Sequence, residues 1–157
     1  KSSFMHYFIA DLAQAEGLET RHVLSKTKCL SADVAAAFDP TYASVYEPTN
    51  SCYINNGVGM SKYTGARGKA GSSEASAEFV AEIRNIFNKN DVLWQIGELG
   101  KIDAGGGGTV ALYIANLNVD VLDVGVPVLS MHAPFEVVSK LDVYMTYKGI
   151  KAFYEAK

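Results

Sequence analysis

The segment from Val119 to Leu129 constrains the fold of this chain more than any other, because it is long and almost continuously apolar. A run of this kind is typical of a β-strand whose two faces are both buried. Such strands occur in largely parallel sheets that carry helices on both sides. This segment therefore predicts an α/β fold.

Helices are expected around the strands, because four segments place apolar residues three or four positions apart. Glycine after the first segment and serine or proline before later ones are typical helix boundary residues. The expected helices are Phe4 to Ala15, ended by Gly17; a helix capped by Ser72 or Ser73, with Phe79, Ile83, Ile86 and Phe87 on its apolar face; Thr109 to Leu117; and a last helix that begins at Pro134 and carries Val138, Leu141, Met145 and Ala152.

Apolar runs between these helices predict the strands. The expected strands are Arg21 to Val34, Cys52 to Ile54 (continued by 58–63 or folded back as a hairpin), Val92 to Ile96 and Val119 to Leu129, with loops over Phe38 to Asn50 and Thr64 to Ser73. The order α-β-β-α-β-α-β-α predicts a mostly parallel sheet with helices on both faces. In such sheets, ligands bind beyond the carboxyl ends of the strands.

Length, charge and cysteine content exclude several classes of protein. The 157 residues fit one domain. A net charge of −3 and the lack of a Lys/Arg patch argue against nucleic acid or an anionic membrane as a partner, and no apolar run reaches the roughly 18 residues of a membrane span. Cys29 and Cys52 are expected to be free thiols of a cytoplasmic protein, and the absence of a Cys-x-x-Cys pair excludes zinc ribbons and thioredoxins.

A run of four glycines, Gly105 to Gly108, precedes Thr109 and the third expected helix. Backbone N–H groups at such a helix start can bind a substrate carbonyl or an anion. The run is not a P-loop, because no Lys-Ser/Thr pair follows it, and Val110 stands where a dinucleotide fingerprint needs its third glycine. A flexible turn is the alternative interpretation.

Two residues with metal-ligand side chains follow apolar strands. Asp33 ends the run Ser31-Ala32-Asp33, and a buried carboxylate there needs a cation, a metal or a helix terminus as its partner. His132 lies where the strand 119–129 gives way to the last expected helix. The alternatives are a helix cap over 34–38 for Asp33 and a core histidine for His132.

Several charged residues accompany these candidates. Lys62, Arg67 and Lys69 lie in an expected loop and could contact an anionic substrate group, with solvated surface charge as the alternative. Glu98 and Glu136 could accept a hydrogen bond from a ligand histidine, which usually donates its second ring N–H to a carboxylate or carbonyl.

Four motifs occur in an order and spacing that resemble the aspartyl aminopeptidase family of co-catalytic zinc metallopeptidases, in particular its bacterial branch. They are Ser31-Ala32-Asp33-Val34, Asp103 through Thr109, Val126 through His132, and Tyr144-Met145-Thr146-Tyr147-Lys148. The resemblance covers essentially the whole chain. Ala36 replaces a histidine and Phe135 an arginine of many members, which leaves the preferred N-terminal residue of the substrate open.

The resemblance implies a site for two zinc ions, with cobalt and manganese as alternatives, in which Asp33 is the later aspartate ligand and His132 the final histidine ligand. It places the other ligands and the general base before Lys1, so no catalytic residue is assigned within 1–157. A carboxylate oxygen and a neutral imidazole nitrogen are both accepted by zinc.

The resemblance also implies a substrate site. Gly106, Gly107, Gly108 and Thr109 would line it, and Lys62, or alternatively the position of Ser61, matches a lysine that some members place near the substrate.

The same resemblance implies that residues 1–157 are the C-terminal part of a metallo-aminopeptidase catalytic domain, without its upstream half and its inserted oligomerisation domain. The expected partners are peptide substrates, the rest of that domain and further copies in a tetrahedral dodecamer. The chain by itself is expected to be inactive. The alternative function is a nucleotide- or anion-binding α/β module that uses the glycine run.

Overall fold

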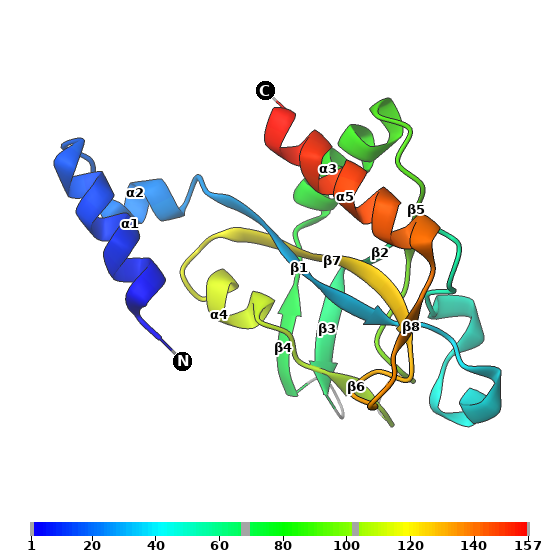
Figure 1. The fold of residues 1–157 in the computed structure, drawn as a ribbon. Coiled ribbons are helices and arrows are strands. Elements are labelled where there is room, and N and C mark those ends of the chain that lie inside the picture. Colours follow the sequence, from blue (N-terminus) through cyan, green and yellow to red (C-terminus); the bar gives the residue numbers. More distant parts are fainter. Residues whose placement is uncertain (1, 67–69, 102–103, 157) are drawn as a thin grey trace.

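The computed structural model describes residues 2–66, 70–101 and 104–156, which form two sheets with helices around them (Figure 1). The helices are α1 (Phe4–Ala15), α2 (Thr20–Leu24), α3 (Ala77–Lys89), α4 (Ala111–Ala115), α5 (Lys140–Glu155) and the 3-10 helices η1 (Pro40–Val45) and η2 (Pro48–Asn50). The strands are β1 (Lys28–Ala36), β2 (Val58–Ser61), β3 (Tyr63–Ala66), β4 (Ala70–Glu74), β5 (Trp94–Ile96), β6 (Gly106–Gly107), β7 (Asp120–Leu129) and β8 (Val137–Val138).

The larger sheet has the strand order β1-β7-β2-β5, with β8 paired to the last residues of β7. β1 runs parallel to β7 over nine residue pairs and β2 runs parallel to β5, whereas β2 and β8 are antiparallel to β7. β7, the apolar segment expected to be buried, lies in the interior of this sheet (Figure 1). The predicted α/β class with a mostly parallel sheet is confirmed.

Helices cover both faces of the larger sheet, because β7 presents alternate residues to opposite sides. On one face, α3 and α5 pack over a core that includes Val58, Met60, Phe79, Ile83, Phe87, Leu122 and Val124. On the other face, α4 packs over a smaller core of Leu24, Ala111, Val119 and Val121. Among the described residues, no helix is both long and apolar enough to cross a membrane.

The smaller sheet, with the order β4-β3-β6, is antiparallel and is not predicted by the sequence. Strands β3 and β4 occupy most of the segment 64–73, so the prediction of a loop there is wrong. This segment is rich in glycine and serine and lacks the alternation of large apolar residues that identifies a strand. Backbone pairing with neighbouring strands therefore specifies this sheet more than side-chain burial does.

Two strand predictions in the first half of the chain need correction. The expected strand from Arg21 to Val34 contains helix α2 before β1 begins at Lys28. The expected strand at Cys52 is only an isolated bridge to Ala37, and β2 starts at Val58. Both stretches have mixed apolar patterns that are compatible with either element, and tertiary packing decides between them.

Three helix starts also differ from the predictions. The helix expected from Thr109 to Leu117 is shorter, since α4 spans Ala111–Ala115. Ser72 and Ser73 lie in β4, and the cap of α3 is Ser76, whose hydroxyl accepts a hydrogen bond from the Phe79 N–H. Pro134 lies in a turn and not in a helix. α5 begins after Ser139, which caps it through the Leu141 N–H, and Val138 is an exposed residue of β8. Helix α1, in contrast, has the predicted ends.

Asp142 ties α5 to the turn before β2. Its fully buried carboxylate accepts hydrogen bonds from the Asn55 N–H (2.6 Å) and the Gly57 N–H (2.7 Å). Because Asp142→Ala leaves both donors without an acceptor, we expect it to lower the free energy of unfolding by about 2 kcal/mol. Urea unfolding measures this change. Glu155→Ala, an exposed site at the end of the same helix, is the control, and equal effects of the two variants would contradict the prediction.

Candidate metal and substrate site

A small cleft of about 30 Å³, lined by apolar residues and a few polar ones, lies beside β1, β7 and β2. Residues of one strand point alternately to opposite faces, so Ser31 and Asp33 of β1 share a face. In the register of the sheet Ser31 stands opposite Asp123, and Asp33 opposite Gly125. These four residues line the cleft together with Thr64 and Thr109.

Three glycines give this cleft its shape, because no side chain fits where they lie. A Cβ atom on Gly125 would lie 1.8 Å from the Asp33 carbonyl oxygen, and one on Gly97 would lie 2.5 Å from the Cys52 nitrogen. On Gly59 it would lie 2.7 Å from the Cys52 Sγ. None of these glycines is predicted as a site residue, because an isolated glycine in a sequence gives no sign of which part of the chain will approach it.

Asp33 lines the cleft with an exposed side chain, and its Oδ1 accepts a hydrogen bond from the Val34 N–H at 2.7 Å. It lies inside β1, which continues to Ala36, so the prediction that Asp33 ends its strand is wrong. The alternative of a helix cap over 34–38 is also wrong, because residues 34–36 are strand. The carboxylate is therefore open to solvent at the side of the cleft.

His132 lies in the turn that joins β7 to β8, with an exposed side chain and a backbone φ of 66°. The backbone N–H of His132 donates to Glu136 Oε1 at 2.5 Å, so the Glu136 side chain stabilises the turn through a contact with the His132 main chain. The core-histidine alternative is wrong, since the ring is exposed. β1 and β7 are parallel, so Asp33 and His132 both lie toward the same edge of the sheet. Within the described structure, Asp33 lines the cleft and His132 does not.

Two of the predicted substrate-binding glycines form backbone pairs within the smaller sheet. Gly106 and Gly107 form β6 and pair with Ala66 and Gly65 of β3, so the alternative of a flexible turn is wrong for them. Gly108 and Thr109 continue from this strand, and Thr109 lines the cleft.

The charged candidates divide between the cleft and other places. Lys62 forms an ion pair with Glu74 and lines a separate hollow, so the structure does not bring it to the cleft. Glu98 does line the cleft. Arg67 and Lys69 lie outside the described residues.

Asp123, a cleft residue missed by sequence reasoning, accepts a hydrogen bond from the Thr109 hydroxyl through Oδ2 at 2.9 Å. Burial raises the pKa of this carboxyl group, and the charge of Asp33 raises it further, whereas the Ser31 and Thr109 hydroxyls lower it. The only signal in the sequence was an acidic residue within a continuous apolar run.

The donor set for a metal is incomplete within the described residues. Asp33 and His132 offer one carboxylate and one imidazole, whereas a zinc site needs three or four protein ligands. The described part of the chain contains no group of three or more His, Cys, Asp or Glu residues that could hold a metal.

Both cysteines are free, as predicted, and Cys52 is expected to resist alkylation. Burial raises the pKa of its thiol to about 12, with smaller contributions from Asp142 and Glu98. Because only the thiolate reacts, iodoacetamide at pH 8 should modify Cys52 far more slowly in the native protein than in urea. The raised pKa also contributes stability below pH 9 that is lost as the pH rises toward 12. Cys29, which is partly exposed, is the internal control, and faster labelling of Cys52 would contradict the prediction.

Known proteins similar to this chain agree on one family. The family model described as aminopeptidase I zinc metalloprotease (M18) matches residues 1–154. A probable M18 family aminopeptidase 1 of Clostridium acetobutylicum is 46% identical over an alignment of 157 positions that covers 98% of this chain and 34% of that protein.

Solved structures give the same result. The crystal structure of an M18-family aminopeptidase from Thermotoga maritima superposes with a TM-score of 0.91 at 39% identity, covering 97% of this chain and 35% of that one. The mApe1 dodecamer structure from S. cerevisiae, at 18% identity and a TM-score of 0.68, covers 88% of this chain and 29% of that one, and shares the fold. The chain spans about a third of the length of the curated relatives it matches. With the whole stretch 1–154 matched and the fold shared, this chain belongs to the M18 family of aminopeptidase I zinc metalloproteases.

Proposed function

We propose that this chain forms part of the catalytic domain of a metallo-aminopeptidase, which removes N-terminal amino acids from peptides by means of a water activated by two zinc ions. The observation that carries the proposal is the family match over 1–154, which includes both Asp33 and His132. The nucleotide-binding alternative receives no support from this match.

Asp33 and His132 are proposed as one oxygen and one nitrogen ligand of the metal site. Asp33 lies on β1 and His132 in the turn after the parallel strand β7, and both side chains are exposed, which leaves them accessible to ligands from elsewhere in the protein. Bound metal ions of this kind supply a hydroxide at neutral pH and polarise the peptide carbonyl. The segment Gly108–Thr109 beside the cleft is proposed to bind the substrate backbone, because its short side chains allow close approach.

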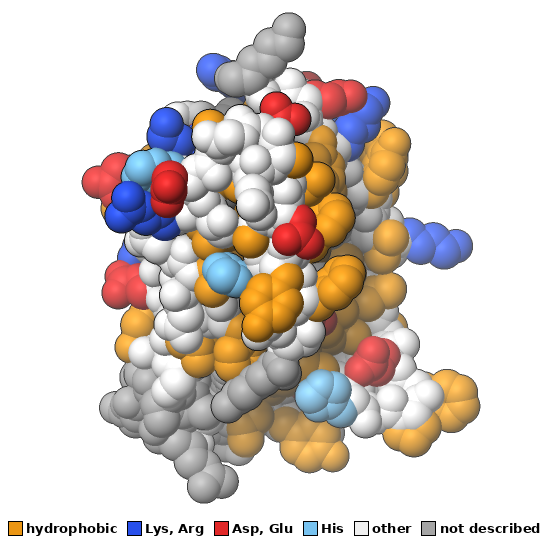
Figure 2. All heavy atoms as spheres, turned by 90° about the vertical axis from the view of Figure 1, so that its left-hand side faces the viewer, with side chains coloured by type: hydrophobic (Ala, Val, Ile, Leu, Met, Phe, Trp, Pro, Cys, Tyr) orange, Lys and Arg blue, Asp and Glu red, His pale blue; other side chains and the backbone are white. Residues whose placement is uncertain are grey.

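We also propose that residues 1–157 are one part of a larger catalytic domain. Helix α1 supports this, because its contacts are mainly with α2 and it exposes Phe4 (75%), Tyr7 (65%), Phe8 (54%) and Leu12 (53%). Figure 2 looks onto this side of the molecule, where hydrophobic side chains gather. An apolar patch of this kind usually marks an interface. By itself, the 157-residue chain is expected to cleave no peptides, since two ligands cannot hold two metals.

Assembly and location are further parts of the proposal. We propose a homo-oligomer, in line with the dodecamer named for the S. cerevisiae protein of the same fold. We propose a cytoplasmic location, because both cysteines are free and disulfides are rare in that reducing compartment.

The experiment uses the whole protein that carries this sequence and a series of aminoacyl p-nitroanilides. We expect hydrolysis that a zinc chelator abolishes and that added zinc restores, with cobalt and manganese tested in parallel. Metal analysis of the active protein should give two zinc ions per chain. Hydrolysis that survives complete removal of the metal would contradict the proposal.

A further inference from the structure

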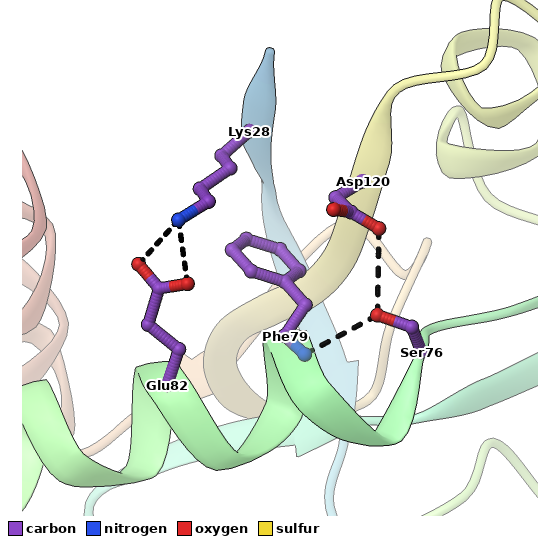
Figure 3. A network of polar contacts seen from close by, with 5 residues as sticks. All are labelled: Lys28, Ser76, Phe79, Glu82 and Asp120. Atoms are coloured by element: carbon purple, nitrogen blue, oxygen red, sulfur yellow. Dashed lines mark hydrogen bonds and ion pairs between the residues drawn. The ribbon is translucent and has the colours of Figure 1, made fainter. Parts of the chain in front are cut away.

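Two aspartates of β7 each contact a hydroxyl group that accepts a backbone hydrogen bond at the start of a helix. Asp120 Oδ1 lies 3.4 Å from Ser76 Oγ, which in turn accepts from the Phe79 N–H at the start of α3 (Figure 3). Asp123 Oδ2 accepts from Thr109 Oγ1 at 2.9 Å, and the same Thr109 oxygen accepts from the Ala111 N–H, 3.2 Å away, at the start of α4. Both contacts join a carboxylate to a hydroxyl group, but they lie in different surroundings.

The Asp120 contact lies on the outside of the molecule. Ser76 and Asp120 are exposed, and the nearby ion pair between Lys28 and Glu82 at 2.6 Å also links the larger sheet to α3 (Figure 3). No site residue takes part in this network, so it fixes only the position of a helix.

The Asp123 contact lies inside the cleft. Among the described residues, Ser31 Oγ, Thr64 Oγ1 and Asp123 Oδ1 are the buried side-chain polar atoms that make no hydrogen bond of normal length and angle, and all three residues line that cleft. The Ser31 hydroxyl is nevertheless close enough to Asp123 to lower the pKa of its carboxyl group. Ser31 and Thr64 are 5% and 4% exposed. Buried polar groups are almost always paired, so these three groups need an explanation. Asp123 is the buried carboxylate among them, and its other oxygen holds Thr109.

We propose that Asp123 is a positioning residue for substrate binding. By accepting a hydrogen bond from the Thr109 hydroxyl, it fixes the end of the glycine segment against β7. Asp123 lies two residues before Gly125, which pairs with Asp33 in the sheet. This inference rests on the proposed function. The glycines at 105–108 have no side chains that could hold the segment, so the Thr109 hydroxyl is its first side-chain contact with the larger sheet. Loss of that contact lets the segment move relative to Asp33.

The first experiment measures the kinetics of Asp123→Ala in the whole protein. We expect KM for an aminoacyl substrate to rise about 10-fold or more, with a smaller change in kcat, because the substrate-binding segment loses its anchor while the metal ligands remain. Asp123→Asn, which keeps an acceptor for Thr109, should recover most of the loss. Asp120→Ala, the matched control on the same strand, should change KM less than about 2-fold.

A second variant keeps the test decisive if Asp123→Ala fails to fold. Thr109→Val removes the hydroxyl, keeps the side-chain shape and leaves the carboxylate in place. It should raise KM at least as much as Asp123→Ala, because it also removes the acceptor of the Ala111 N–H. The double variant should be no worse than Thr109→Val alone, because both substitutions remove the same contact between Thr109 and Asp123. Additive effects in the double variant would overturn the inference.

A readout independent of activity separates this inference from the proposed function. Amide hydrogen exchange of a peptide covering 109–113 should be about 10-fold faster in Asp123→Ala, with peptides from α3 unchanged. Absence of metal-dependent activity in the wild-type protein would contradict the proposed function. An active wild type in which Asp123→Ala leaves KM or the exchange at 109–113 unchanged would contradict this inference alone.

Discussion

Replacing His132 by asparagine is expected to lower metal-dependent aminopeptidase activity by about 10²- to 10³-fold and to reduce the zinc content of the protein. The loss follows because the imidazole nitrogen is proposed as a metal ligand, and the activated water and the peptide carbonyl depend on that metal. Asparagine is the better replacement for this position. The backbone φ of 66° lies in the left-handed region, which asparagine adopts more readily than alanine.

The control for this variant is His22→Asn. His22 is exposed on α2, takes part in no proposed site, and should change activity less than about 2-fold. Circular dichroism and urea unfolding of both variants establish that the fold is retained. Wild-type turnover with unchanged zinc content in His132→Asn would show that His132 is not a ligand and that this part of the site assignment is wrong.

Replacing Gly125 by alanine is expected to have the largest effect on stability, about 3 kcal/mol or more in the free energy of unfolding. The new Cβ would lie 1.8 Å from the Asp33 carbonyl oxygen, whereas real Cβ contacts essentially never fall below 3.0 Å. The obstacle is backbone and cannot rotate away, so β1 must separate from β7 at the position of Asp33. Activity should therefore fall together with stability, because the proposed ligand is displaced.

Gly17→Ala is the matched control for this substitution. Gly17 has a φ of 67° and no atom within 4 Å of the added Cβ, so alanine there meets backbone strain without overlap. We expect a cost of about 1 kcal/mol at Gly17. Urea unfolding of both variants compares the loss of stability from atomic overlap at Gly125 with the loss from backbone strain at Gly17. A Gly125→Ala protein as stable as Gly17→Ala would contradict the close approach of β1 to β7.

The sequence determined the elements whose side chains carry a periodic pattern. The apolar run at 119–129 became the buried strand β7, Phe4 to Ala15 became α1, and Phe79, Ile83 and Phe87 became the buried face of α3. These predictions succeeded because burial selects apolar residues at the period of the local structure. The site candidates Asp33, Thr109 and His132 also come from sequence motifs, and their roles stay predictions.

The tertiary structure alone decided the rest, because it depends on backbone contacts between segments distant in sequence. The small sheet β4-β3-β6 has no apolar alternation, and Gly59, Gly97 and Gly125 are required only by neighbours that approach them in the folded chain. Asp123 meets Thr109 across 14 residues, and no local pattern indicates which hydroxyl a strand carboxylate will hold. Side-chain periodicity thus gave the strands and helices of the core, whereas strand register and close backbone approach gave the geometry of the cleft.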